Sequence, residues 1–365
     1  HERVEGMFKD LESTWAVFSK EQSVFSGWSW CDAWWRTWGE LCNLNLHLYT
    51  LKDNDGREIA IAPFFSVSQK NRLGFYLDRL HVFGNLYPSD TTVLSEYIDL
   101  PIDTTRRDAV AVELSVLLGH IHWDEFVVPF TTEKSFIYEF LHDYEDQFRF
   151  LDVVHEGSGI RIDTSGSFDN YLKGLGKNTR LKLYNRRKVL EFLGELDIEY
   201  ACPNNIGEFL DDLNRLSKDR WGRYCFGPQS TAFHLDVALQ ACIDGNLLFS
   251  RVKVDNEVVS VLYNIRSNGV EYNIQSAYVE DYHPKLSLGT LHLGYSIEAA
   301  FSDAEIQSFD LLFGEGKNSS YKEHLGGCRE DFFTLTCGKT FKSKILSRMQ
   351  RFARYVKQSV FKLLR

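Results

Sequence analysis

The sequence of 365 residues lacks the features that mark membrane-spanning, secreted and zinc-binding chains. No apolar run approaches the roughly 20 residues that a bilayer-spanning helix needs, and no segment is typical of a secretory signal peptide. The seven cysteines are odd in number, scattered and never spaced Cys-x-x-Cys, a pattern that argues against disulfides and zinc. We therefore expect a cytoplasmic protein with reduced thiols and no metal.

Positive charge is also scarce, since the net charge is −10. Nucleic-acid binding needs a clustered excess of lysine and arginine, so we expect no nucleic-acid partner. Residues 177–188 depart from this average because they are helical in pattern and strongly basic. This segment is either a solvated helix face or a cationic wall for the phosphates of a nucleotide or a lipid-linked sugar.

The sequence does contain enough apolar residues, 44%, for two hydrophobic cores. Trp30, Trp34 and Trp38 recur at helical spacing, which is more typical of a core than of a ligand platform. The order helix, hairpin, strand, helix, strand occurs twice, which indicates a duplicated α/β (α+β) architecture. Its first copy has helices at 26–39 and 104–119 with strands at 45–51, 58–67, 78–83 and 123–128; its second has helices at 230–244 and 288–301 with strands at 247–254, 257–265, 270–277 and 308–313.

The short, glycine-rich segment 155–160 is the best candidate for a boundary between the two copies. We therefore predict an N-terminal domain at residues 1–157, a C-terminal domain at 158–338 and a separate basic amphipathic helix at 339–365.

Several segments share their order and spacing with a known enzyme family. They are Trp34-Trp35 through Gly39, Ile59 to Pro63, Arg79 to Gly84 followed by Ser89-Asp90, Asn178 to Leu183 with Arg186-Arg187, Leu216 to Trp221, Ser287-Leu288-Gly289, and Phe309 to Gly314 with Tyr321-Lys322. In these segments the chain resembles the two-domain GNAT acyltransferases of bacterial cellulose and exopolysaccharide gene clusters, the CelD-like group, and more distantly the FemABX aminoacyl transferases. It departs from the pattern at Leu288, where many relatives have proline.

The resemblance implies tandem GNAT-like acyl-CoA N-acyltransferase domains, each a mixed twisted sheet flanked by helices. It implies transfer of an acetyl or other acyl group from acyl-CoA, by direct attack, to an amine or hydroxyl of a sugar, nucleotide-sugar or polysaccharide precursor. In GNAT enzymes the donor lies between splayed parallel strands, with its phosphates on a helix N-terminus. The residues in the matching place are Lys285, Ser287, Leu288, Gly289 and Thr290, although an ordinary helix cap would look the same. Nothing after Tyr87 resembles this loop, so we expect no donor site in the N-terminal domain.

The candidate catalytic residues follow the last strand of the second copy. Asp310 ends a buried strand, where a carboxylate is either a general base or the partner of Lys322 or Arg220. Tyr321 is a candidate for protonating the leaving thiolate or a core residue, and Lys322, by resemblance, faces an acceptor phosphate or the acyl intermediate.

Four further residues are candidates for the acceptor side. Arg220 and Trp221 offer a cation and a flat apolar face suited to a sugar or nucleotide. Asp90 is a candidate from the N-terminal half, and His324 is a reserve base.

Two other functions remain open, namely FemABX-like aminoacyl transfer and a catalytically inactive glycan-binding or scaffold protein of a polysaccharide synthesis complex.

The tail leaves two alternatives of its own. From Lys339 to Arg365 there are nine basic residues and no acidic one, with apolar residues at intervals of three and four from Phe341 to Leu363. This helix either packs its apolar stripe on the C-terminal domain or docks on an anionic membrane, at the periphery of the inner membrane, or on a synthase subunit.

Overall fold

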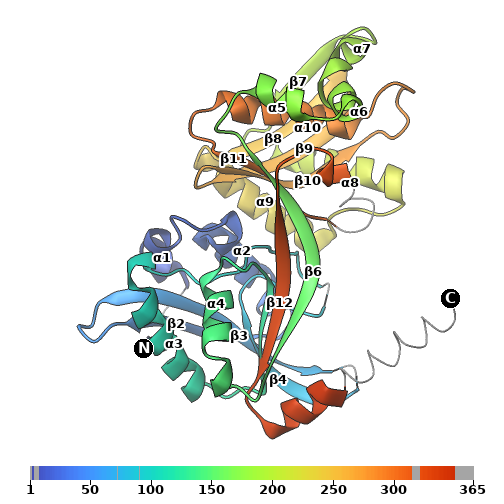
Figure 1. Ribbon diagram of the computed structural model, residues 1–365. Helices are drawn as coiled ribbons and strands as arrows, with labels where there is room; N and C mark the ends of the chain where they lie inside the picture. The colour runs from blue at the N-terminus through green and yellow to red at the C-terminus, as the bar shows by residue number, and fades with distance from the viewer. Residues whose placement is uncertain (1, 4–7, 72, 90, 315–320, 350–365) are drawn as a thin grey trace, which may run out of the picture. The chain divides into compact units, whose positions relative to one another are not determined.

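The computed structural model describes residues 2–3, 8–71, 73–89, 91–314 and 321–349 (Figure 1). The chain divides into two compact units, an N-terminal unit of residues 1–156 and 332–365 and a C-terminal unit of residues 157–331. The chain therefore passes between the units twice, once within β6 (Phe150–Asp163) and once within β12 (Cys328–Gly338). Among the described residues, no helix is long and apolar enough to cross a bilayer.

The N-terminal unit contains one mixed sheet with helices on both faces. Its strands pair in the order β1-β2-β3-β4-β5-β12, and only the β4–β5 pair is parallel. The elements are β1 (Glu2–Arg3), α1 (Glu12–Phe18), α2 (Trp28–Trp38), β2 (Asn45–Lys52), β3 (Glu58–Lys70), β4 (Tyr76–Val82), α3 (Arg107–His120), β5 (Glu125–Thr131) and α4 (Phe136–Asp143).

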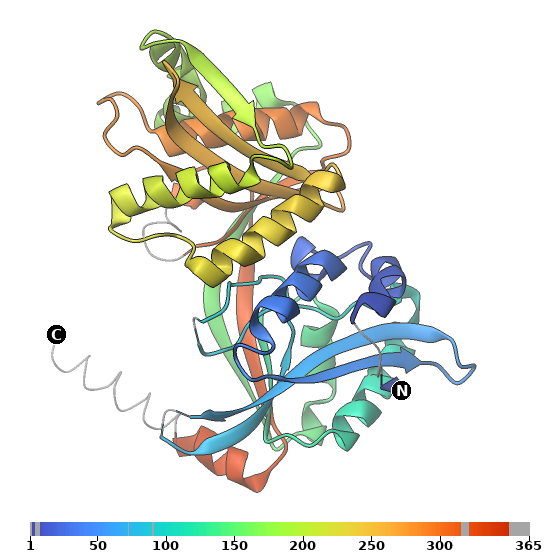
Figure 2. The same ribbon diagram turned by 180° about the vertical axis from the view of Figure 1, so that it is seen from behind.

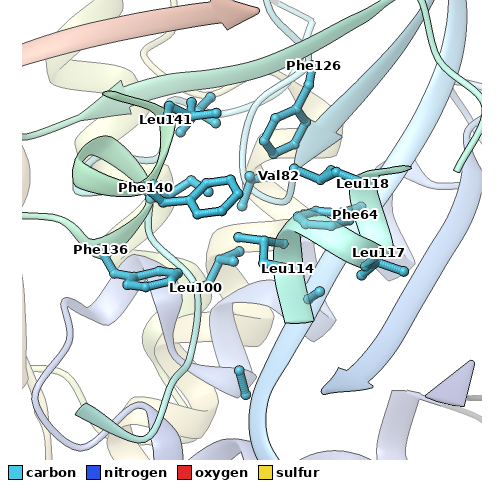
Figure 3. Packing of buried hydrophobic residues seen from close by; sticks show 14 of the residues in the cluster. Phe64, Val82, Leu100, Leu114, Leu117, Leu118, Phe126, Phe136, Phe140 and Leu141 are labelled. Atoms are coloured by element: carbon cyan, nitrogen blue, oxygen red, sulfur yellow. The ribbon is translucent and has the colours of Figure 1, made fainter. Parts of the chain in front are cut away.

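Alternation along β3 assigns the two faces of this sheet, because successive side chains of a strand point to opposite sides. Phe65 packs against Trp34 of α2, with ring centroids 5.2 Å apart. Its neighbour Phe64 packs against Phe126 on the other face, where α3 and α4 complete the main core (Figure 3). Trp30, Trp34 and Trp38 are at most 2% exposed, so the aromatic stripe belongs to the core.

The C-terminal unit has the same sheet pattern. Its strands pair in the order β7-β8-β9-β10-β11-β6, and only the β10–β11 pair is parallel. The elements are α5 (Phe168–Gly174), α6 (Lys177–Arg180), α7 (Arg187–Glu191), β7 (Leu196–Tyr200), α8 (Ile206–Trp221), α9 (Pro228–Ile243), β8 (Leu247–Val254), β9 (Glu257–Ser267), β10 (Val270–Tyr278), α10 (Leu288–Ser302) and β11 (Ser308–Gly314). The fold is thus the predicted α/β duplication.

Two strands, β6 and β12, run from one unit into the other, and only β12 returns the chain to the unit that it left earlier. Residues 158–163 of β6 pair with β11, and residues 333–338 of β12 pair with β5. The segment 155–160, predicted as a linker, is therefore part of a continuous strand. Its Gly157 is required by packing, because a Cβ there would lie 2.6 Å from the Phe313 ring. Likewise residues 332–338, predicted to end the C-terminal domain, belong to the N-terminal unit.

The start of the tail also belongs to the N-terminal unit, where residues 341–349 form a helix. The Lys339 ammonium donates to the carbonyls of Leu118, Gly119 and Ile121 at 2.8–3.0 Å, at the C-terminal end of α3, where the helix dipole favours a cation. The expectation that the tail packs on the C-terminal domain is wrong for these residues; the predictions for residues 350–365 lie outside the described residues.

Candidate functional site

The parallel strands β10 and β11 of the C-terminal unit pair over three residues and then separate. The pairs are Val270 with Ser308, Glu271 with Phe309 and Tyr272 with Asp310. Both strands change register just beyond them, β10 between Asn273 and Gln275 and β11 between Asp310 and Phe313. The two parallel strands are therefore unpaired with each other at their carboxyl ends, and we call this separation the slot. The carboxyl ends of the strands are where open α/β sheets bind ligands.

Asp310 lies at the point of separation and is fully buried. Its Oδ2 accepts hydrogen bonds from Nε and Nη2 of Arg161 on β6 at 2.9 and 2.8 Å, and its Oδ1 accepts from the Leu312 amide at 2.8 Å. Leu312 has a positive φ of 58°, which an L-residue adopts only when its surroundings enforce it. Asp310 therefore holds the β11 bulge. Of the two roles expected for it, the structure supports the ion pair, with Arg161 in place of Lys322 or Arg220.

Lys322 holds the same bulge from the other side. Its ammonium group donates to the carbonyls of Leu311, Leu312 and Phe313 at 2.5, 3.0 and 2.7 Å, and the residue is only 8% exposed. A lysine ammonium has three protons, and three backbone oxygens surround this one. The expectation that Lys322 faces an acceptor phosphate or the acyl intermediate does not fit this geometry.

A buried polar network supports the end of β10 from within the core. Glu271 accepts hydrogen bonds from Asn264 of β9 and Ser296 of α10, both at 2.7 Å, and Asn273 donates to the Asn264 side chain at 2.7 Å. Burial raises the pKa of Glu271, while these donors oppose that rise. The network fixes α10 against β9 and β10 and so fixes the position of the helix N-terminus.

The N-terminus of α10 follows directly on the carboxyl end of β10. Helix geometry leaves the amides of Leu288, Gly289 and Thr290 without acceptors inside the helix, and Ser287 makes no side-chain cap. The Ser287 hydroxyl instead contacts the Thr290 hydroxyl at 3.1 Å. Amides, hydroxyls and the positive end of the helix dipole together form an arrangement suited to phosphate oxygens. Lys285, in the preceding loop, is exposed.

Gly289 is required by the packing of an aromatic ring. The Tyr278 ring lies against its Cα, and a Cβ on Gly289 would be 2.2 Å from Cε1 of Tyr278. Gly289 is therefore the contact that seats Tyr278 at the carboxyl end of β10.

We expect Gly289→Ala to lower the free energy of unfolding of the C-terminal unit by about 1–3 kcal/mol, because the Tyr278 ring must move. Urea denaturation measures this. In a Tyr278→Leu background the same substitution should cost less. An equal cost in both backgrounds would show that the tyrosine ring is not the obstacle.

Arg220 connects this tyrosine to the candidate acceptor residues. Its guanidinium lies 4.1 Å from the Tyr278 ring centre and 4.4 Å from that of Trp221, and its Nε is 3.3 Å from a carboxylate oxygen of Glu280. Trp221 is 59% exposed, so its ring is open to a ligand. The structure thus brings Arg220 and Trp221 together with Tyr278 and Glu280, two residues that the sequence analysis did not single out.

Tyr321 belongs to the same cluster. Burial and the nearby Tyr278 raise the pKa of Tyr321 to about 12, although Arg220 lowers it in part. The phenol therefore keeps its proton at neutral pH, which fits a proton donor and excludes a base. His324 is exposed, with its amide on the Tyr321 carbonyl at 3.2 Å. Asp90 lies outside the described residues.

Part of the C-terminal unit matches a known family. Residues 177–323 match the Acetyltransferase (GNAT) domain. The matched residues include the slot, the α10 N-terminus and Tyr321. No curated protein matches the chain.

Solved structures share the fold over nearly the whole chain. FemX has a TM-score of 0.58 at 10% identity, covering 91% of this chain and 97% of that chain. The C-terminal domain of a putative lysylphosphatidylglycerol synthetase from Agrobacterium fabrum has 0.55 at 12% identity, covering 94% and 96%. L-PGS from Bacillus licheniformis has 0.54 at 13% identity, covering 95% and 96%. At these identities the likeness shows the fold alone.

In the N-terminal unit, a loop segment lies beside β5 where the C-terminal unit has the slot. The Ile98 amide donates to the Phe130 carbonyl of β5, so residues 95–98 lie beside that strand. Asn85 and Ser95 exchange two hydrogen bonds of 2.7 Å that hold this segment. The Asp99 carboxylate accepts from the first amides of α4, Phe136 and Ile137, at 2.9 and 3.0 Å. A protein carboxylate thus occupies the helix N-terminus that follows β5.

The basic segment 177–188 packs along α10 in the C-terminal unit. A π-helical turn (Leu181–Asn185) places the Leu183 carbonyl directly against Gly294 of α10. A Cβ added to Gly294 would lie 2.1 Å from that oxygen. Arg187 is stacked on Tyr295, 4.0 Å from its ring centre, and paired with Glu298. Lys177, Lys182 and Lys188 are exposed. Within the described ranges, no cluster of three or more His, Cys, Asp or Glu side chains could hold a metal ion.

Proposed function

We propose that the C-terminal GNAT domain transfers an acyl group from acyl-CoA to an amine or hydroxyl acceptor. The observation that carries this proposal is the slot between β10 and β11, which ends beside the uncapped N-terminus of α10. The slot suits the linear acyl-pantetheine arm, and the amides of Leu288, Gly289 and Thr290 with the Ser287 hydroxyl suit its pyrophosphate. Acetyl-CoA is the simplest such donor.

The reaction is direct attack within a ternary complex. The lone pair of the acceptor nitrogen or oxygen forms a bond to the thioester carbonyl carbon, the carbon–sulfur bond breaks, and an amide or ester results. The thiolate that leaves takes a proton, for which we assign Tyr321, because its raised pKa keeps it protonated. The acceptor nitrogen or oxygen releases one proton as the new bond forms, and this proton restores the Tyr321 phenol, so the products are the amide or ester and the free thiol. Asp310 and Lys322 are positioning residues in this scheme, since their contacts shape β11.

The acceptor lies on the side of Trp221 and Arg220 in this proposal. An exposed indole face suits the apolar face of a sugar ring, and the adjacent guanidinium suits a phosphate or a carboxylate. A sugar, nucleotide sugar or polysaccharide precursor satisfies both. This choice agrees with the CelD-like group that the sequence resembles. We further propose a cytoplasmic location. We also propose catalysis in the C-terminal unit alone, because residues 95–98 of the N-terminal unit lie beside β5 beyond the end of its pairing with β4.

Two substitutions of one residue test the donor site. Ser287→Asp places a carboxylate at the α10 N-terminus, where it caps the helix as well as serine does but repels phosphate. Ser287→Asn is the matched uncharged control. We expect acetyl-CoA affinity, measured by calorimetry, to fall about tenfold or more in Ser287→Asp and to stay within about twofold in Ser287→Asn.

Other outcomes would contradict the proposal in distinguishable ways. Acetyl-CoA binding that is equal in both variants would place the pyrophosphate elsewhere. Absence of binding for a series of acyl-CoAs in the parent chain would favour aminoacyl transfer or a non-catalytic glycan-binding role, the two alternatives left open by the sequence.

A further inference from the structure

The exposed face of the terminal helix (residues 341–349) is apolar. Phe341, Ile345 and Met349 are 65%, 45% and 49% exposed, whereas Ser343, Leu346 and Ser347 are at most 6% exposed and face the protein. The stripe predicted from the sequence therefore points away from the unit that the helix packs on. This orientation is fixed by side-chain contacts, because Thr340 donates to Asp124 at 2.7 Å and Lys342 pairs with the same carboxylate at 3.3 Å.

A second apolar group lies at the tip of the β3–β4 hairpin. Leu73, Phe75 and Tyr76 are 37%, 53% and 56% exposed. The hairpin tip and the terminal helix share a neighbour, since the amide of Asp78, just after the tip, donates to the Asp124 carboxylate. Figures 1 and 2 both show the light-blue ends of β3 and β4 beside the red helix. Exposed aromatic and aliphatic side chains from two segments thus gather at one end of the N-terminal unit.

Basic residues surround these apolar side chains. The Lys70 ammonium lies 5.2 Å from the Tyr76 ring centre, and Lys344 and Arg348 project from the terminal helix. Asp124, the carboxylate in contact with this region, has a lowered pKa; burial would raise it, but hydrogen bonds from Thr340 and the Asp78 amide and its pairing with Lys342 outweigh burial. The sequence after Met349 continues the pattern, with five more basic residues and no acidic one.

We propose that this surface, formed by Leu73, Phe75 and Tyr76 of the hairpin tip and Phe341, Ile345 and Met349 of the terminal helix, docks on an anionic lipid bilayer. Aromatic and aliphatic groups that enter the headgroup boundary, with lysine and arginine beside them, are the composition of an interfacial membrane anchor. An anionic surface also attracts each of these cations, which a neutral surface does not. The proposal is independent of the reaction that the C-terminal unit carries out.

Vesicle flotation with the full chain tests it. Vesicles of phosphatidylcholine alone are compared with vesicles containing about 30% phosphatidylglycerol at moderate salt. The parent chain should float with the anionic vesicles and remain below with the neutral ones. Phe341→Ser/Ile345→Ser/Met349→Ser should weaken partitioning about 30-fold or more, and Leu73→Ser/Phe75→Ser/Tyr76→Ser should also weaken it. Lys344→Glu/Arg348→Glu should weaken it about tenfold or more.

The matched control is Val112→Ser/Val116→Ser, which removes two exposed apolar residues from α3 of the same unit and should leave flotation unchanged. All substituted side chains are on the surface, so circular dichroism should show intact folds. Binding that the helix triple variant retains would overturn the proposal, as would equal flotation on neutral vesicles or none on anionic ones. Self-association that disappears in the helix variant without any flotation would show instead that the surface binds a second copy of the chain.

Discussion

Lys322→Met should lower the free energy of unfolding of the C-terminal unit by about 3–5 kcal/mol, because it leaves three buried carbonyls without their donor. Methionine keeps the length of the side chain, so the loss is that of the charged hydrogen bonds and not of volume. Urea unfolding followed by circular dichroism measures the change. Hydrogen exchange of β11 should accelerate, since its bulge loses its central support.

The control is Lys173→Met, which removes an exposed lysine from α5 in the same unit and should change stability by less than about 0.5 kcal/mol. Tryptophan fluorescence gives a second control. Trp221 is the one tryptophan between residues 157 and 331, so fluorescence reports mainly on the N-terminal unit and should change less. A Lys322→Met variant that is as stable as the parent but inactive would assign the lysine to the substrate instead.

Acidification should weaken the fold through three buried histidines. Burial, and for His81 also the nearby Arg79, lowers the pKa values of His81, His234 and His292 to about 3. In the unfolded chain these imidazoles bind protons from about pH 6.5 downward, whereas in the folded chain they do not until about pH 3. Each therefore subtracts about 1.4 kcal/mol of stability per pH unit as the pH falls through this window.

Buried carboxylates oppose this trend. Burial raises the pKa of Asp99 to about 6, so as the pH falls this carboxylate binds a proton at a higher pH in the folded chain than in the unfolded chain. Comparing a histidine variant with the parent chain at each pH removes the contribution of these carboxylates, because both chains contain them. His81 is stacked on Phe65 at 4.9 Å, and neither ring nitrogen has a hydrogen-bond partner among the described residues. We expect His81→Phe to gain about 1.4 kcal/mol over the parent for each pH unit below 6.5.

Urea denaturation at pH 7, 6 and 5 measures this gain. His120→Gln, which removes an exposed histidine of the same unit, should parallel the parent at all three values. If His81→Phe and the parent keep a constant difference across this range, His81 binds protons equally in the folded and the unfolded chain.

The sequence was sufficient for the helices and strands that recur in the two copies, because each has its own apolar periodicity and its own turn residues. It did not predict β7 or β12, and it ended the strand before residue 155 that the structure continues to Asp163. It was insufficient where a residue's role depends on a partner far away in the chain. Arg161 is 149 residues from Asp310, so the ion pair that occupies this carboxylate could not be found from the strand that contains Asp310. Gly157 and Gly289 suggested a linker and a phosphate loop, but each is required because an aromatic ring packs on it.

The candidate site shows the same limit. The pattern singled out the start of α10, Arg220, Trp221 and Tyr321, and the structure groups the last three around Tyr278. Tyr278 itself carried no signal, since a tyrosine at a strand end is common. Periodicity found the apolar stripe of the tail, but only contacts such as Thr340 with Asp124 determine which side of the helix faces the protein.

The return of β12 to the N-terminal unit has a consequence for synthesis on the ribosome. β5 ends at Thr131, but residues 333–338, which pair with it, are made about 200 residues later. At about 5–20 residues per second, the edge of β5 would wait on the order of 10–40 seconds for its partner. An unpaired edge strand is a template for aggregation. The nascent N-terminal unit should therefore depend on chaperones until translation passes Gly338, whereas β6 is already present when β11 emerges.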